Sequence, residues 1–261
     1  MKVVAGRDHA AATVDAVQQA RIDLAAAHRL AYMHGFHEGV CNHLTMAVPG
    51  TTDRFFLIPY GLHWSEVTAS SFMIVKYDGE IVEGEGEAEM SAFCIHAPIH
   101  RLRPDAVCVL HTHMPYASAL ARLEDPELQL IGQTEVKMAA FMAYDREYTG
   151  LADDPSEGER LAAAMAPDKT ILFMAHHGVI VTGKNVAEAY DRLYYLERAC
   201  QVQLHAMWTG RKLKYIAPPV LKKTLAQFAT TKALGNKPAP CEIHFAALKR
   251  ILDRNEPDYA A

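Results

Sequence analysis

The chain has 261 residues, of which 50% are hydrophobic and 22% charged, and its formal net charge is −5 at pH 7. These values are ordinary for a globular protein with one sizeable core. Because the chain has no basic run and no apolar stretch of transmembrane length, neither nucleic-acid binding nor membrane insertion is expected.

The cysteines and the first residues indicate a cytoplasmic protein. The five cysteines are odd in number, scattered and mostly in apolar surroundings, which is typical of reduced, buried thiols. The N-terminus, MKVVAGRDHAAA, is too polar for a signal peptide. The fourteen histidines are the unusual feature of the composition, and they raise the expectation of a metal site.

The N-terminal part begins with a helix, predicted over residues 13–34 because apolar residues recur there at helical spacing. A loop and a short strand are expected over 36–50, and a second strand over 54–61. The backbone is expected to turn sharply at Asn42 and Gly61. Amides freed at such turns could hold an anion.

The next segment is predicted to form a short helix, a strand at 72–77, a hairpin turn at Asp78-Gly79 and a helix over 90–102. The acidic run before this last helix is interpreted as a solvated loop, and it comprises Glu83, Glu85, Glu87 and Glu89. The helix carries His96 and His100 at i and i+4. That spacing can chelate a metal, but it is more often part of a half-buried helix face.

The stretch 106–121 is interpreted as a buried strand that ends in His111-Thr112-His113, followed by a turn and an apolar helix. Side chains at i and i+2 of a strand point to the same face, so His111 and His113 would project side by side. Two such imidazoles form a chelating pair if a third ligand is near. The alternative is that one histidine is a core residue bonded to the backbone while the other faces solvent.

A second apolar run, 170–183, is predicted to form one continuous central strand, and it carries His176 and His177. We expect this strand to lie close to the one that carries His111 and His113. His177 would then complete a site of three histidines for one divalent metal ion. His176 competes for this place, but adjacent strand residues face opposite sides, so at most one of the two should reach the metal directly.

The remaining elements include two predicted helices. Residues 128–150 are expected to hold a short strand, a loop and another strand, with Glu135 in a site wall or a subunit contact. A helix over 156–166 with a serine cap follows. A long helix is predicted from its cap at Asn185 to about Thr209.

The order of these elements fits a three-layer α/β/α fold with a mixed central sheet. We assign residues 1–210 to one domain with this fold. Beyond Gly210, lysines and prolines punctuate the chain. Residues 211–261 are therefore predicted to be an extension that packs on the domain or on a neighbouring subunit.

Six motifs between about Asp15 and Trp208 resemble those of a known family. They are 41-CNHLT-45, 57-LIPYGLHWSEVTASS-71, 91-SAFCIHAPIHRLRPDA-106, 109-VLHTH-113, 176-HHGVIVTG-183 and 193-LYYLERACQVQ-203. Together they resemble the class II aldolase/adducin family. The third to fifth are similar to L-fuculose-phosphate and L-ribulose-phosphate aldolases, and the second and last to the adducin head domain and its bacterial relatives. The resemblance implies a class II aldolase-like fold with a largely antiparallel sheet.

The resemblance also implies a site. In the aldolases, the HxH pair and the second histidine of HHG hold a catalytic Zn²⁺, and these positions fall on His111, His113 and His177. The anionic group of the substrate would be lined by the backbone near Asn42 and near Gly61, together with Ser91. The family further implies a homotetramer with the active site at a subunit interface.

One position departs from the aldolase pattern. The aldolases carry a glutamate, which acts as acid and base, directly after the serine that falls on Ser91, whereas this chain has Ala92. The nearby Glu89 could replace it if the loop shifted, an alternative that we do not favour. Decarboxylation needs a later proton donor but not that base, so the departure favours decarboxylation over aldol cleavage. The predicted proton donor is His96, His176 or a tyrosine of the neighbouring subunit.

We therefore predict a divalent-metal-dependent carbon–carbon lyase, either an aldolase-type enzyme or a decarboxylase, for a small anionic hydroxy-carbonyl or hydroxy-acid substrate. It would hold one divalent metal ion per subunit, with zinc favoured and manganese or iron as alternatives. The second hypothesis is a non-catalytic binding or assembly module in the manner of the adducin head. It is weakened because the adducin-like branch loses metal histidines that this chain keeps. A non-haem iron oxygenase is a remote third reading, since no facial carboxylate is evident.

Overall fold

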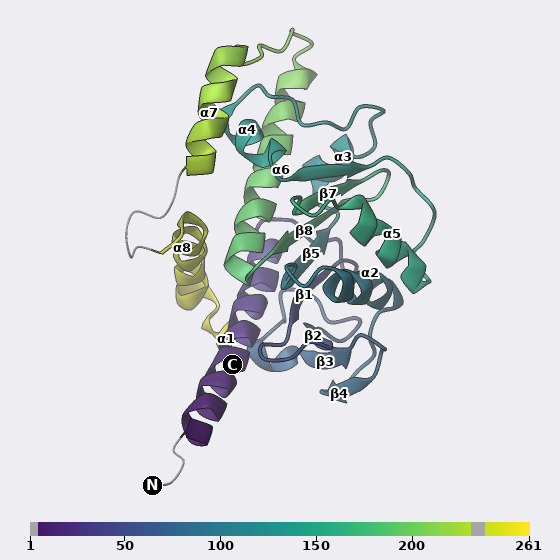
Figure 1. The fold of residues 1–261 in the computed structure, drawn as a ribbon, viewed down its shortest axis with the longest axis vertical. Helices are drawn as coiled ribbons and strands as arrows, with labels where there is room; N and C mark the ends of the chain where they lie inside the picture. The colour runs from purple at the N-terminus through teal and green to yellow at the C-terminus, as the bar shows by residue number, and fades with distance from the viewer. Residues whose placement is uncertain (1–4, 231–237) are drawn as a thin grey trace.

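An eight-stranded sheet organises the molecule, whose computed structural model describes residues 5–230 and 238–261 (Figure 1). The strand order is β4-β3-β2-β1-β5-β8-β7-β6. Neighbouring strands run antiparallel, except that β6 and β7 run parallel. The bounds of the strands are β1 His43–Ala47, β2 Arg54–Leu57, β3 Met73–Lys76, β4 Ile81–Glu83, β5 Cys108–Thr112, β6 Met142–Asp145, β7 Ile171–Met174 and β8 Val179–Gly183.

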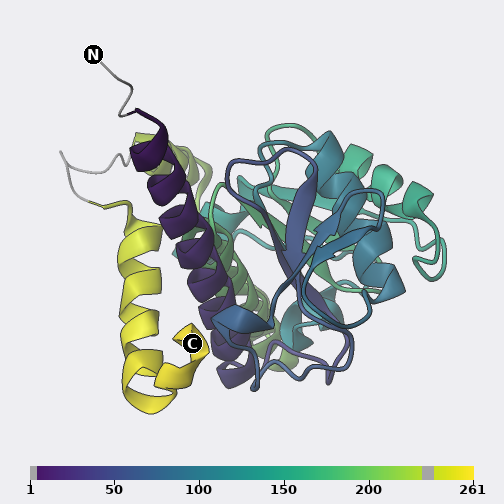
Figure 2. The same cartoon turned by 90° about the horizontal axis from the view of Figure 1, so that it is seen from below.

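Helices cover both faces of this sheet, which gives the predicted three layers (Figure 2). Helices α2 and α5 pack on one face, and α1, α6 and α8 lie on the other. The bounds of the helices are α1 Ala5–Met33, α2 Met90–Leu102, α3 Pro115–Leu120, α4 Gln133–Ala139, α5 Pro155–Ala164, α6 Val186–Trp208, α7 Pro218–Thr230 and α8 Pro240–Asn255, with 3-10 turns η1 Ala69–Ser71 and η2 Pro257–Ala260.

The central strands β5 and β8 are mainly apolar because both of their faces are buried. In β8, Val179 and Val181 belong to the core under α1 and α6, whereas Ile180 belongs to the core under α2 and α5. Strand β5 alternates in the same way, with Leu110 on the first side and Val109 on the second. By this period of two, His111 lies on the α2 side of the sheet.

The apolar run 170–183 is not one strand, and this prediction was wrong. It folds into a hairpin in which β7 and β8 pair antiparallel, with Leu172 opposite Ile180. The two predicted histidines therefore lie in the hairpin turn rather than within a strand. Continuous burial on both faces hides the turn, because neither arm shows the alternation that marks a half-buried strand.

The segment 128–150 also differs from its prediction. The expected first strand is absent among these residues, and helix α4 takes the place of the predicted loop before β6. Glu135 is buried on α4 and lies outside the cavity described below. The next helix, α5, is capped by the carboxylate of Asp154, which accepts the backbone N–H of Ser156, and not by that serine.

The long helix α6 agrees with its prediction. The side chain of Asn185 accepts the backbone N–H of Glu188 at 2.8 Å, as expected for an N-cap. Its buried stripe faces the sheet through Leu193 and Leu196, which are fully buried. The helix α2 begins and ends at the predicted residues.

The C-terminal helices pack against the rest of the chain. In α8, Phe245 is buried against Tyr190 of α6, and Lys249 pairs with Asp23 of α1 at 2.6 Å. Helix α7 contacts α4. The boundary at residue 210 and contact with a neighbouring subunit stay predictions. None of the described helices is both long and apolar enough to cross a membrane.

Candidate metal centre

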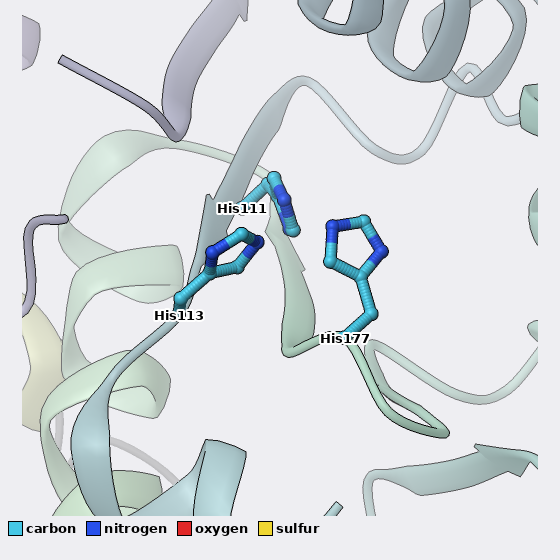
Figure 3. A group of neighbouring side chains, drawn as sticks. All are labelled: His111, His113 and His177. Carbon is cyan, nitrogen blue, oxygen red and sulfur yellow. The ribbon is translucent and has the colours of Figure 1, made fainter. Parts of the chain in front are cut away.

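Three histidines from β5 and the β7–β8 turn come together at one point. Strand β5 pairs with β8 along its whole length, so its end lies beside the turn that precedes β8. The candidate ligand atoms of His111, His113 and His177 all lie within 4.8 Å of one another. Their ring centroids are 4.9, 4.8 and 4.8 Å apart. Figure 3 shows the three rings turned toward a common space.

The tight hairpin turn is what brings His177 to the end of β5. His176 adopts a left-handed backbone conformation with φ 60°, and His177 and Gly178 follow it into β8. A Cβ at Gly178 would lie 2.5 Å from the carbonyl oxygen of Thr112 and 2.8 Å from Cδ2 of His113. Only a glycine lets the turn approach β5 so closely. The glycine of the HHG motif is therefore part of the geometry of the site.

Hydrogen bonds fix the tautomers of two of the rings. Nδ1 of His111 donates to the carbonyl oxygen of Val179 at 3.0 Å, which leaves the lone pair on Nε2 free. Nδ1 of His113 pairs with the carboxylate of Glu38, and its Nε2 is buried without a hydrogen-bond partner in the described part of the chain. Metal-binding histidines typically use one ring nitrogen while the other donates to a carbonyl or a carboxylate. The donor set therefore fits a divalent ion that accepts imidazole nitrogen, such as zinc.

Burial lowers the pKa of two of the three rings, those of His111 and His177. Desolvation, with further effects of neighbouring histidines, lowers the pKa of His111 well below its ordinary value. The pKa of His177 is lowered to about 4, first by desolvation and then by His113. A neutral imidazole offers the lone pair that a metal needs, so His111 and His177 can bind a metal without losing a proton.

A cavity of about 550 Å³ opens beside the three histidines. Asn42 lines it and is only 2% exposed; its Oδ1 accepts the backbone N–H of His113 at 3.1 Å. Its Nδ2 is buried and has no partner among the described residues, so it is a donor available to a bound molecule. Asn42 holds a left-handed conformation with φ 85°, which fits the sharp turn predicted there.

The other residues predicted to bind substrate differ in whether they line the cavity. Ser91 lines the cavity, but its hydroxyl donates to the carboxylate of Glu89 at 2.7 Å. Gly61 turns the backbone with φ 88° but does not itself line the cavity, whereas its neighbour Tyr60 does. His176 is exposed and lines the cavity near Tyr148. Their roles toward a substrate stay predictions.

Glu89 is the site residue that the sequence reasoning set aside. Its carboxylate caps α2 by accepting the N–H of Ala92 at 2.7 Å, and it lines the cavity without any shift of the loop. Nε2 of His43, another lining residue, lies 3.2 Å from the same carboxylate, close enough for an ion pair although not aligned as a hydrogen bond. Burial alone raises the pKa of Glu89, but the contacts with His43, Ser91 and Ala92 lower it to about 2.

Behind this wall lies a second group of histidines. His96 and His100 of α2 are 0% and 4% exposed, and neither lines the cavity. The hydroxyl of Thr45 lies 2.7 Å from Nδ1 of His96 and 2.9 Å from Nε2 of His100. Nδ1 of His100 donates to the carbonyl oxygen of Ala106 at 3.0 Å. This position fits the alternative prediction that both histidines are packed residues of a helix face. The catalytic role of His96 stays a prediction.

Comparison with known proteins gives a consistent family match. Residues 22–204 match the family model described as Class II Aldolase and Adducin N-terminal domain. An aldolase II superfamily protein from Pseudomonas syringae has a similar structure, with a TM-score of 0.85 and 34% identity, covering 94% of this chain and 96% of that one. The L-fuculose 1-phosphate aldolase from Glaciozyma antarctica PI12 shares the fold, with a TM-score of 0.77, 24% identity and coverage of 93% and 92%. Alpha-adducin of Rattus norvegicus is 30% identical over 89% of this chain, which spans 33% of adducin.

Proposed function

This chain belongs to the class II aldolase and adducin family, and on that premise we propose that it is a divalent-metal-dependent carbon–carbon lyase. Its substrate is a small anionic hydroxy-carbonyl compound or hydroxy acid, and the reaction is aldol cleavage or decarboxylation. The observation that carries the proposal is the convergence of His111, His113 and His177 beside a cavity. One divalent ion per subunit, zinc first and manganese or iron as alternatives, suits these ligands.

The bound ion supplies Lewis acidity, which stabilises the negative charge that develops on a substrate oxygen when the carbon–carbon bond breaks. The residues of the chain orient the substrate. Nδ2 of Asn42 is a free, buried donor in the cavity wall, and it would donate to a substrate oxygen. A fixed donor favours the charge of the transition state because it needs no reorganisation.

A proton donor completes this mechanism. His176 is exposed in the cavity wall, so it is the predicted donor with direct access to a substrate. His96 is buried behind His43, with ring centroids 5.8 Å apart, so it could act on a substrate only through that neighbour. We retain the preference for decarboxylation, since Ala92 replaces the aldolase acid.

We further propose that the protein works as a cytoplasmic homotetramer with the cavity at a subunit interface. Large apolar side chains at the cavity mouth are exposed in the single chain, as expected if a second subunit approaches there. They are Tyr60, Met90, Tyr148 and Leu151. A tyrosine from that subunit is an alternative proton donor.

Metal content tests the proposal directly. The purified protein is loaded with Zn²⁺, Mn²⁺ or Fe²⁺, freed of excess metal, and its metal content is measured by mass spectrometry. We expect one ion per chain in the wild type and in His205→Ala, a control at an exposed histidine of α6, and a loss of this ion in His111→Ala. Equal metal contents in His111→Ala and the control would contradict the proposal.

Product analysis separates the two reactions. The metal-loaded protein is incubated with hydroxy-sugar phosphates and with hydroxy-aromatic or keto acids, and aldehyde and CO₂ are measured. Release of CO₂ supports the decarboxylase and release of aldehyde the aldolase.

The alternative function is a non-catalytic binding or assembly module, and the similarity to alpha-adducin favours it. This alternative predicts no turnover of any of these substrates. It also predicts that the binding of partner proteins does not depend on the three histidines. A wild-type protein that takes up no stoichiometric metal would favour the module over the lyase.

A further inference from the structure

The N-terminus of α2 opens into the candidate active-site cavity. Met90 and Ser91, in the first turn of this 13-residue helix, both line the cavity. The free N–H groups of a first turn, together with the helix dipole, favour an anion at such a place. A phosphate group of a substrate would be bound well there if the place were open.

The chain itself fills this place with a carboxylate. Glu89 accepts the N–H of Ala92 and the hydroxyl of Ser91, both at 2.7 Å, and lies 3.2 Å from Nε2 of His43. With its pKa lowered to about 2 by these contacts against the effect of burial, the carboxylate is ionised throughout the neutral range. Two donors that could hold a substrate anion, the N–H of Ala92 and the hydroxyl of Ser91, are therefore already used, and a second anion would meet a like charge.

The rest of the lining does not offer a replacement phosphate site near α2. Among the described residues that line the cavity, Arg122 is the single arginine or lysine, against the three acids Glu38, Glu89 and Asp153. Its guanidinium lies 3.5 Å from the carbonyl oxygen of His177, beside the metal ligands and not beside α2. Negative charge on a substrate is thus favoured at the metal end of the cavity.

Apolar side chains also line the α2 end of the cavity, beside Glu89. Met90 and Tyr60 line it and are 60% and 57% exposed. The backbone N–H of Tyr60 donates to the carbonyl oxygen of Glu87, which holds Tyr60 next to the segment that leads into α2. A neutral group that carries a hydroxyl suits this end, because it can donate to the Glu89 carboxylate and contact the apolar side chains.

We infer that Glu89 excludes phosphate from the cavity, so that the substrate is a hydroxy acid without a phosphate group whose carboxylate lies at the metal end and whose neutral, hydroxyl-bearing end faces Glu89. This inference rests on the proposed function, since it names the substrate class of the same cavity. It makes Glu89 a specificity-determining residue, and it separates this chain from enzymes that act on sugar phosphates.

Two ligands that differ only in a phosphate test the inference. Glycerate and 3-phosphoglycerate share a 2-hydroxy acid, and the second carries a phosphate on its far hydroxyl. Calorimetric titration of the zinc-loaded wild type should give at least tenfold tighter binding of glycerate. The variant Glu89→Gln keeps an oxygen that can cap α2 but removes the charge, and it should reduce this preference at least tenfold.

Matched variants keep the result interpretable. Glu87→Gln removes the same charge from an exposed side chain two residues away, and it should leave the preference unchanged. Glu89→Ser, which retains a good N-cap, should act as Glu89→Gln does, and thermal melting checks that each variant is folded. Equal binding of the two ligands by the wild type, an unchanged preference in both Glu89 variants, or no binding of either ligand would overturn the inference.

Inorganic phosphate separates this inference from the proposed function. Titrated into the metal-free proteins, it should bind Glu89→Gln at least tenfold more tightly than the wild type, whether or not the chain binds zinc. A chain that fails to load zinc but gives this phosphate result contradicts the proposed function alone. Stoichiometric zinc with equal phosphate binding by the two proteins contradicts the inference alone.

Discussion

His111, His113 and His177, the cavity histidines, differ from His96 and His100, the buried histidines, in what their ring nitrogens contact. Among the cavity histidines, one nitrogen of His111 and of His113 donates to a fixed acceptor and the other is left free at the cavity. The buried histidines instead share the hydroxyl of Thr45 between them, and Nε2 of His96, which has no partner among the described residues, does not line the cavity. The comparison teaches that histidine spacing alone does not identify a metal site. A metal site is identified by free lone pairs that face a common cavity.

The largest effect is expected when one of the cavity histidines is replaced. His177→Ala removes a metal ligand, so zinc affinity should fall by more than about 100-fold, beyond the usual effect of losing a partner of a ligand. The affinity is measured by competition with a chromophoric chelator. His100→Asn serves as the control from the buried histidines, and it should retain the wild-type affinity. Comparable losses in the two variants would mean that the two groups do not differ as described.

Acid should destabilise the protein through the buried histidines. Burial lowers the pKa of His100 to about 4, although its hydrogen bond to Ala106 opposes this, whereas the pKa of an unfolded histidine is 6.5. The unfolded chain therefore binds more protons between these values, and stability falls as the pH is lowered from about 6.5 toward 4. His100 contributes about 3 kcal/mol to this decrease in the free energy of unfolding.

Urea unfolding of the metal-free protein at several pH values measures this effect. His28 is also fully buried with its pKa lowered to about 4, so it adds to the total slope. The share of His100 is read from the difference between the wild type and His100→Asn, whose stability should depend less on pH. Parallel curves for the two proteins would show that His100 does not titrate in this way.

A smaller effect is expected when the link between the buried histidines is removed. Since Nδ1 of His100 donates to Ala106, its Nε2 accepts the hydroxyl of Thr45, and that oxygen accepts Nδ1–H of His96. Thr45→Val leaves both rings without this partner and should lower the free energy of unfolding by about 1–3 kcal/mol. Zinc affinity should change less than about twofold. Thr45→Ser, which keeps the hydroxyl, should recover most of the stability.

The smallest expected effect concerns the partner of a cavity histidine. Glu38 holds Nδ1 of His113, and Glu38→Gln weakens this contact without removing a ligand. Zinc affinity should fall by about 10-fold, with little change in the stability of the metal-free protein, because Glu38 is exposed. Glu66→Gln, on the loop before η1, is the matched control. An unchanged affinity in Glu38→Gln would show that His113 is oriented without its carboxylate.

Much of the cavity site could be predicted because it depends on one strand. The i, i+2 spacing of His111 and His113 places both at the end of β5, on the same face. The hairpin could not be predicted, since β7 and β8 are apolar on both faces and the turn between them contains no proline or asparagine. The left-handed backbone of His176 has no signal in the sequence.

The role of Glu89 was hidden for a different reason. It ends an acidic run whose members Glu83, Glu85 and Glu87 are exposed, as a solvated loop requires. Only the position of Glu89 directly before α2 distinguishes it, since a carboxylate there can cap the helix. The burial of His96 and His100 was underestimated because their partner, Thr45, lies on a strand more than 50 residues away.

The most direct test of the account is X-ray absorption spectroscopy of the protein loaded with one equivalent of zinc. We predict three imidazole nitrogens at about 2.0–2.1 Å, with no sulfur ligand. The spectrum of His111→Ala should lose one of these nitrogens or lose the bound zinc altogether. A sulfur ligand at about 2.3 Å, which Cys41 in the cavity wall could supply, or fewer than three imidazoles in the wild type, would contradict the account.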